Sequence, residues 1–256
     1  MTMVTQRGNA VRVIAPIAVG VVALTVWQVG VTAANIEAYL LPSPLSIVGE
    51  TAQYGPSIVS GAAITGLNAL VGLVLGSLLG IVGALLASAS RFVDQLAAPL
   101  IAALAVVPIV ALAPVLNTMY GADSQFARQA IAAIAVFIPV FVNTLRGLRQ
   151  ALPVHRDLMR SYAAPGLTVM RTVTLPTAVP FIFTGIRIGS SLAVISALVA
   201  EYFGGPRGGL GGLITTAASG SAYSRAWAYV LGAIALGLAF FLITLALERF
   251  ATRRQR

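Results

Sequence analysis

The chain has no cysteine, no lysine and a single histidine, His155. Without cysteine it can form neither a disulfide bond nor a thiolate metal site, and one histidine cannot build a multi-histidine metal site. Charged residues are also scarce, at 9% of the 256 residues, whereas a soluble domain has about 25%. So few charges cannot cover a water-facing surface of ordinary size. A GxxxxGK(S/T) phosphate-binding loop is absent from the sequence, which excludes ATP hydrolysis through that motif.

Apolar residues are what the sequence has in excess. They make up 58% of the chain and gather in runs of about 20 residues, the length of a helix that crosses a hydrocarbon core of roughly 30 Å. The runs do not alternate polar and apolar residues, which argues against a transmembrane barrel. The first run is too long for a signal-peptide core and should be a retained helix. We therefore expect one all-α integral membrane domain, 1–256, with six transmembrane helices. The expected spans are about 11–31, 57–89, 95–116, 129–145, 179–200 and 226–247.

The distribution of arginine predicts an orientation. All sixteen basic residues are arginines, and the formal net charge is +9. On a soluble protein this balance would suggest nucleic acid, but arginine also gathers in the cytoplasmic loops of helical membrane proteins. With the N-terminus inside, twelve arginines fall in inner segments, while Arg128, Arg207 and Arg225 fall in outer ones and Arg187 lies within the fifth span. We expect both termini and the segment 148–178 in the cytoplasm, and no nucleic acid as a partner.

The second span carries glycines four residues apart, at Gly72, Gly76 and Gly80. Such residues lie on one face of a helix and let two helix backbones approach closely, which favours packing where lipid removes the hydrophobic driving force. We interpret this stripe as a helix-packing face, within the subunit or between subunits, rather than as a ligand site.

Four polar residues and one proline inside or near the spans are candidates for lining a pathway. They are Asn68, Pro108, Asn143, Arg187 and Glu201. Proline removes a helical hydrogen bond and kinks its helix, and an ionisable side chain at membrane depth should face protein, water or the interface. For Arg187 the sequence leaves open whether it reaches back to the cytoplasmic headgroups or lines a cavity. For Asn143 and Glu201, which lie near span ends, hydration at the interface is the competing interpretation.

Two outer segments have a character of their own. Segment 40–50, LLPSPLSIVGE, places Pro42 and Pro44 before a short amphipathic run, which predicts a surface helix. Segment 201–214, EYFGGPRGGLGGLI, has six glycines between positions 204 and 212, so its backbone can make tight turns. We expect a re-entrant loop or a mobile outer gate there.

The most charged stretch, HRDLMRSYAAPGLTVMRTVTLPTAVP at 155–180, lies between the fourth and fifth spans. A helix over 153–162 would place Arg156 and Arg160 on one face, with Asp157 beside them, before a Pro-Gly pair ends it. The positive-inside rule explains arginines in a solvated loop, but it does not explain their alternation with apolar residues. We therefore interpret this stretch as a short amphipathic docking helix.

In this stretch the sequence resembles the permease subunits of bacterial binding-protein-dependent ABC importers of type I. Their cytoplasmic loop carries the motif E-A-A-x3-G-x9-I-x-L-P. With the motif aligned on the Leu-Pro pair at 175–176, Asp157 takes the place of the Glu, Ala163 of the Gly and Val173 of the Ile, while Leu and Met replace the two alanines. Aligned instead on Gly166, the loop is three residues short before the proline.

Other stretches resemble the nitrate/sulfonate/taurine branch of these permeases. They are LPSP after the first span, FTGIRIGSSLAVISALVAEYFGG through the fifth and GLGGLI beyond it, and the similarity extends over about 40–247. LMRSYAA and AEYFGG are closer to the sub-branch that carries riboflavin and pyrimidine precursors of thiamine. The resemblance implies a vitamin or pyrimidine-type cargo, with nitrate, sulfonate or taurine as the alternative. A secondary transporter or a membrane-embedded enzyme is less well supported, because the acidic residues are few and scattered.

The resemblance also implies an architecture and a set of partners. A peripheral first helix, about 11–31, precedes five core helices over about 57–247, and the cytoplasmic loop 148–178 holds a coupling helix between helices four and five. A pair of permease subunits, identical or homologous, forms the pathway in the bacterial inner membrane, surrounded by lipid. ABC ATPase subunits supply ATP and Mg²⁺, and an extracytoplasmic solute-binding protein delivers the solute. This chain would bind no cofactor or metal and would not itself be an enzyme.

The resemblance places a defined set of residues at the ATPase. They are Arg156, Asp157, Arg160, Tyr162, Ala163 and Gly166. Asp157 would accept hydrogen bonds from a basic residue of the ATPase, the two arginines and the tyrosine would contact its surface, and the break at 163–166 would orient the helix. ATP-driven closure of the ATPases would push two such loops together and switch the pathway between inward and outward openings.

Overall fold

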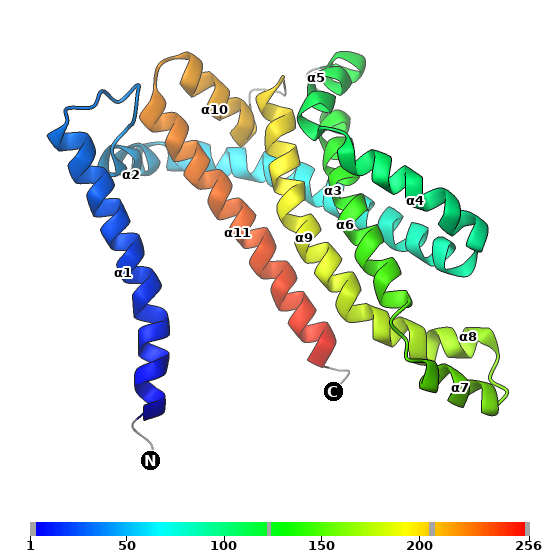
Figure 1. Ribbon diagram of the computed structural model, residues 1–256. Helices are drawn as coiled ribbons and strands as arrows, with labels where there is room; N and C mark the ends of the chain where they lie inside the picture. Colours follow the sequence, from blue (N-terminus) through cyan, green and yellow to red (C-terminus); the bar gives the residue numbers. More distant parts are fainter. Residues whose placement is uncertain (1–3, 122–123, 205–207, 254–256) are drawn as a thin grey trace.

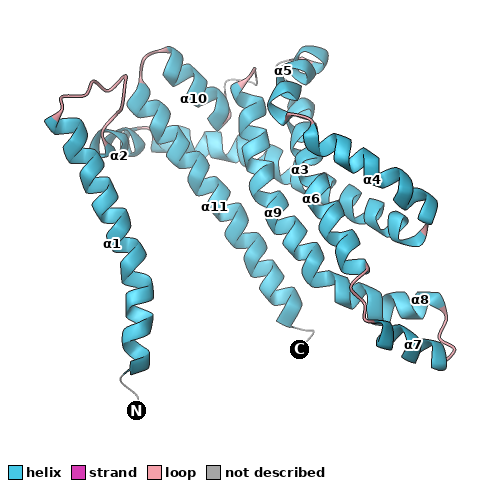
Figure 2. Ribbon diagram, in the orientation of Figure 1, coloured by secondary structure: helices cyan, strands magenta, loops and turns pink. Residues whose placement is uncertain are grey.

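The computed structural model describes residues 4–121, 124–204 and 208–253, and side chains from residue 14 onward. Throughout this described part the regular elements are helices, as the sequence predicts, and no strand occurs in it (Figure 2). The helices are α1 (Val4–Ala33), α2 (Pro44–Gln53), α3 (Gly55–Ala89), α4 (Arg91–Val106), α5 (Ile109–Tyr120), α6 (Gln125–Leu148), α7 (Pro153–Ser161), α8 (Gly166–Val169), α9 (Leu175–Tyr202), α10 (Leu210–Ser219) and α11 (Tyr223–Arg253), with a π-helical turn at Met170–Thr174 before α9.

Five helices are long and apolar enough to cross a membrane, and the pair α4 and α5 supplies a sixth span if it is counted as one. The prediction of six spans is confirmed, but the third span is not the continuous helix expected over 95–116. It is broken between α4 and α5, whose axes differ by 89°. The cause is Pro108, which lacks a backbone N–H and pushes Val107 into an extended conformation (φ −63°, ψ 120°).

The centre of the bundle is α6, which packs between α3 and α9 (Figure 1). Small residues make this close packing possible. A Cβ atom at Gly72 would overlap Ala132 of α6, and one at Gly76 would lie 2.5 Å from the carbonyl oxygen of Ala133. At Gly80 a Cβ atom would lie 3.0 Å from the backbone nitrogen of Phe141. The glycine stripe therefore faces α6 of the same chain, and it lets the backbones of α3 and α6 approach closely.

The first helix stands apart from the other spans, at the left of Figure 1. It meets the rest of the molecule near its C-terminal end, where it packs on α2. There the rings of Trp27 and Trp227 meet edge to face, with centroids 6.1 Å apart, and the Gln28 side chain accepts a hydrogen bond of 3.1 Å from the Leu45 backbone N–H. From residue 14 to residue 26 its apolar side chains are exposed and would face lipid, whereas Val31 near its end is buried.

The predicted surface helix after the first span is α2. Ser43 caps its N-terminus by accepting a hydrogen bond from the Ser46 N–H, and proline occupies the first helical position, where no N–H is needed. The Glu50 side chain at its other end pairs with Arg225 of α11 at 3.1 Å, and the same guanidinium lies 3.9 Å from the centre of the Tyr54 ring. These contacts fix α2 across the end of α11.

The bundle has two distinct ends. Figure 1 shows the start of α1, the last turn of α11 and the pair α7 and α8 at one end, which we call the α7 end, with α2, α5 and α10 at the other. An even number of crossings puts the two ends of a chain on the same side of a membrane. The assignment of the α7 end to the cytoplasm is the prediction made from the arginines. Of these, Arg207, Arg254 and Arg256 lie outside the described residues.

Candidate functional site

The docking helix predicted between the fourth and fifth spans is α7, which projects from the bundle together with α8 (Figure 1). Every residue of α7 is exposed or half-buried. Asp157 and Arg160 form an ion pair of 3.3 Å one turn apart, with side-chain exposures of 67% and 81%. Such an exposed pair contributes little to stability. The charges of α7 are therefore accessible to another molecule without disturbing the core.

Both ends of α7 are fixed by the local sequence. Proline at the first helical position follows Leu152, which has the extended conformation that a residue before proline prefers. At the other end the Ala163 N–H donates to the Arg160 carbonyl at 2.9 Å, and the Ala164 N–H donates to the Met159 carbonyl at 3.0 Å. This pattern is a Schellman motif, and it stops the helix just before Pro165.

Ala163 occupies the left-handed position of that motif, with φ +49°. The position is the one at which the family motif has glycine, which adopts this conformation without a steric penalty. Gly166, in contrast, starts α8, has no positive φ and would meet no atom within 4 Å if it carried a Cβ. The turn that orients α7 is thus made at Ala163, and the geometry gives no reason for a glycine at position 166. This favours the alignment on the Leu-Pro pair.

Replacing Ala163 by glycine is expected to stabilise the end of α7 by about 1 kcal/mol, because an L-residue with a Cβ is strained in the left-handed region. Hydrogen exchange of the amides at positions 163 and 164 should then be slower than in the wild type. Ala164→Gly is the matched control, since that residue has no positive φ, and there exchange should be faster. Unchanged or faster exchange in the Ala163 variant would contradict the strain.

Two of the candidate pathway residues, Asn68 and Glu201, lie in the interior of the chain. Glu201 is 1% exposed and accepts hydrogen bonds from Thr65 (2.7 Å), Asn68 (3.4 Å) and the Gly211 backbone N–H (3.2 Å). Asn68 in turn accepts one from Gln129 at 3.3 Å. We call Thr65, Asn68, Gln129 and Glu201 the polar junction. These groups bond to one another and to the Gly211 backbone, so that the junction joins α3, α6, α9 and α10.

The glycine-rich segment owes part of its composition to this junction. A Cβ atom at Gly209 would overlap the carboxylate of Glu201, and one at Gly211 would overlap the Leu198 carbonyl. The Leu210 N–H also donates to the Thr65 hydroxyl at 2.9 Å. The described part of the segment is therefore anchored in the interior, and from Leu210 onward it forms the helix α10.

Arg128 is a buried residue whose surroundings sequence reasoning missed. The sequence predicts it in an outer segment just before the fourth span, and in the structure it lies in the first turns of α6 and is 0% exposed. Its positive charge interacts with the Glu201 carboxylate of the polar junction. Its position in the sequence could have indicated this burial. An arginine predicted on the outer side goes against the positive-inside bias, and it needs an acidic partner within the protein.

Arg187 has an acidic partner within the chain. Its guanidinium pairs with Glu248 of α11 at 3.0 Å, with side-chain exposures of 30% and 17%, and lies 6.0 Å from the centre of the Phe241 ring. A hydrogen bond of 3.1 Å between Ser190 and Thr244 joins the same two helices. The ion pair brings opposite charges together within the protein and ties α9 to α11.

The last two candidates have local roles. Pro108 is exposed at the break between α4 and α5. Asn143 is half-buried, donates its side-chain N–H to the Pro139 carbonyl at 2.8 Å and faces α9 near Gly185. Within the described part of the chain, no three His, Asp or Glu side chains come together in an arrangement that would hold a metal ion.

Comparison with known proteins identifies the family to which the chain is similar. The family described as binding-protein-dependent transport system inner membrane component matches residues 72–256, which include α7. A riboflavin transport system permease protein of Chloroflexus aurantiacus is 33% identical over 202 residues, covering 76% of this chain and 72% of that protein. A formylaminopyrimidine transport permease protein of Halalkalibacterium halodurans is 30% identical over 186 residues, covering 72% of this chain and 74% of that protein. A crystal structure of an amino acid ABC transporter has the same fold, with a TM-score of 0.64 at 18% identity, over 79% of this chain and 96% of that chain.

Proposed function

Because this chain belongs to the family of binding-protein-dependent transport system inner membrane components, it is a multi-pass permease subunit of an ABC importer, and we propose that an ATPase drives it through α7. We further propose that its cargo is a vitamin or a pyrimidine-type precursor. The observation that carries the first part is the geometry of α7. It is an exposed amphipathic helix that begins at a proline, ends in a Schellman motif and projects from the bundle, with unlike charges on its surface.

Specific residues of α7 would make the contact. In the proposed complex Asp157 accepts charge-assisted hydrogen bonds from a basic residue of the ATPase, which are stronger than bonds between neutral groups. Arg156, Arg160 and Tyr162 contact the surrounding surface, and the turn at Ala163 sets the angle of the helix. ATP and Mg²⁺ are held by the ATPase, and the α7 end of the bundle faces the cytoplasm.

Movement of α7 can reach the spans because its connections are short. Only residues 149–152 separate α6 from α7, and α8 with the following π-helical turn runs into α9. A displacement of α7 would therefore act directly on α6 and α9, the two helices at the centre of the bundle. A second permease subunit, identical or homologous, completes the pathway in the proposed assembly, and an extracytoplasmic binding protein delivers the cargo at the opposite end.

The choice of cargo is supported by two relatives whose names state riboflavin and formylaminopyrimidine as what they transport. Both cargoes contain a nitrogen heterocycle with polar substituents. Nitrate, sulfonates and taurine form the alternative class, and they differ in being small charged molecules without a ring.

We expect ATP hydrolysis by the reconstituted permease and its ATPase subunit to rise several-fold when one ligand-loaded binding protein is added. Riboflavin, formylaminopyrimidine, an alkyl sulfonate and nitrate would each be tested in lipid vesicles, with the unloaded binding protein as control. Stimulation by a heterocyclic ligand alone supports the proposal, and stimulation by the sulfonate or nitrate would replace its cargo class. A permease that inserts but recruits no ATPase would contradict the role of α7.

A further inference from the structure

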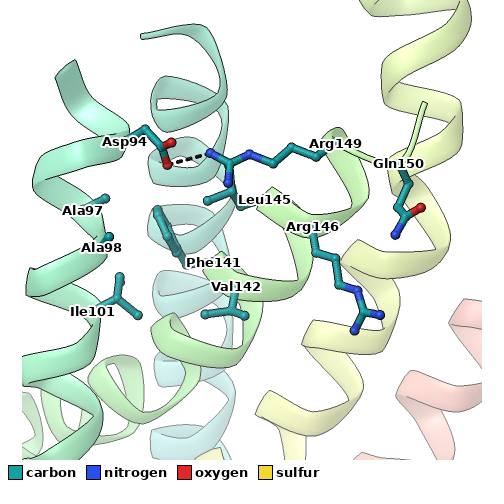
Figure 3. A pocket seen from close by; sticks show the side chains of 10 residues that line it. All are labelled: Asp94, Ala97, Ala98, Ile101, Phe141, Val142, Leu145, Arg146, Arg149 and Gln150. Atoms are coloured by element: carbon teal, nitrogen blue, oxygen red, sulfur yellow. Dashed lines mark ion pairs between the residues drawn. The ribbon is translucent and has the colours of Figure 1, made fainter. Parts of the chain in front are cut away.

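A pocket of about 420 Å³ opens between α4 and α6 toward the α7 end of the bundle (Figure 3). Small and apolar side chains form its walls. Ala97, Ala98 and Ile101 project from α4, and Phe141 and Val142 project from α6. α4 itself has no buried residue in the described structure, so it covers this side of α6 only loosely.

The polar end of the pocket carries an excess of positive charge. Asp94 pairs with Arg149 at 2.6 Å, which neutralises one guanidinium. Arg146 also lines the pocket, and in the described part of the chain it has no ion pair or side-chain hydrogen bond. The net charge of the lining is thus one positive unit, and it is located on Arg146.

The two faces of α4 distinguish this pocket from a groove filled by lipid. Phe92, Leu96 and Leu100 lie on the face opposite the pocket, where they are exposed, as lipid-facing residues would be. The pocket face instead carries two alanines, one isoleucine and an aspartate, so its side chains are smaller and one of them is charged. The pocket also exposes part of α6, the most enclosed span, rather than part of a peripheral helix. Small apolar walls that end in charged groups suit contact with a solute better than contact with lipid tails alone.

We propose that this pocket is a water-filled cargo chamber on the cytoplasmic half of the pathway, and that Arg146 selects solutes that present carbonyl or oxyanion acceptors. The inference rests on the proposed function. A guanidinium only donates hydrogen bonds, in a fork that fits paired oxygens, and it repels cations. The walls beside it accept the flat face of a ring. The chamber therefore takes neutral or anionic, acceptor-rich solutes and disfavours cationic ones.

Because the chain has no cysteine, single cysteines report on this chamber without background. Val142→Cys and Ala98→Cys, in inside-out vesicles of the complex, should react with a charged, membrane-impermeant methanethiosulfonate, while Leu100→Cys on the other face of α4 should not. Reaction of each variant after unfolding in detergent controls for intrinsic reactivity. In the Val142→Cys protein, an anionic reagent should react faster than a cationic one, and Arg146→Gln should reduce that preference by about fivefold, the effect of one nearby charge.

Either of two outcomes overturns the inference. Labelling of all three variants by a lipophilic maleimide alone would show a lipid groove, and an unchanged reagent preference in Arg146→Gln would remove the role of that residue. These rates are measured without nucleotide or binding protein. They are therefore independent of ATPase recruitment, and a failure of the proposed function would leave them unaltered.

Discussion

Asp157→Arg is expected to abolish the stimulation of ATP hydrolysis by the loaded binding protein while the permease remains inserted and folded. The change removes the only acidic side chain of α7 and adds a third arginine beside Arg156 and Arg160. Loss of a charge-assisted hydrogen bond together with repulsion of a basic partner would cost about 3 kcal/mol, a weakening of ATPase binding by roughly a hundredfold. Co-purification of the ATPase and the stimulated hydrolysis rate measure the two effects.

The fold should tolerate this substitution, because Asp157 is exposed and its ion pair with Arg160 adds little stability. Glu37→Arg supplies the same change of charge at an exposed site near the other end of the bundle, and it should leave ATPase binding intact. Asp157→Asn should fall between the wild type and Asp157→Arg, since it retains an acceptor without the charge. Full stimulation in Asp157→Arg would remove α7 from the coupling mechanism.

Glu201→Ala is expected to be the most destabilising single substitution at the polar junction. It leaves the Thr65 hydroxyl, the Asn68 amide and the Gly211 N–H without their common acceptor, and it removes the negative charge that faces buried Arg128. Removing one partner of a buried charged network costs about 3–5 kcal/mol, which corresponds to a fall in Tm on the order of 10 °C. Thermal unfolding in detergent and protease sensitivity of the segment before α10 measure it.

Glu50→Ala is the matched control, because it also replaces a glutamate by alanine, but this glutamate belongs to a surface ion pair. In this variant its partner Arg225 keeps its contact with the Tyr54 ring, and both side chains of the wild-type pair reach solvent. We expect a loss of about 1 kcal/mol or less. Equal Tm values for the Glu50 and Glu201 variants would mean that the polar junction does not hold the outer segment.

The fold follows from the sequence wherever a local pattern is enough. Apolar runs set the spans, and Pro42 and Pro44 before a short amphipathic run predict the surface helix α2. Pro108 predicted a kink, but the 89° turn between α4 and α5 depends on how α4 packs against α3 and how α5 packs against α6 and α9. A proline removes a hydrogen bond in any helix, whereas the resulting angle is set by neighbours that are distant in sequence.

The candidate sites divide in the same way. The docking helix could be delimited from the sequence because its limits are local: a proline begins it and a Pro-Gly pair follows it, and the structure adds that the turn itself is made at Ala163. The candidate pathway residues were selected for polarity at membrane depth. That criterion finds groups that need a hydrogen-bonding partner, but it does not show whether the partner is another group of the protein or water. Glu201 and Arg187 both proved to have partners within the chain.

The sequence by itself determined the class of the protein, its spans, its glycine packing stripe and the position of the exposed charged helix, because these depend on composition and on periodicity along one helix. The tertiary structure alone decided which polar groups meet. Glu201 bonds to Thr65, Arg187 pairs with Glu248 and Asp94 pairs with Arg149, in each case from different helices. Helical periodicity gives the face on which a side chain lies, but the neighbour on that face is fixed only when the helices pack.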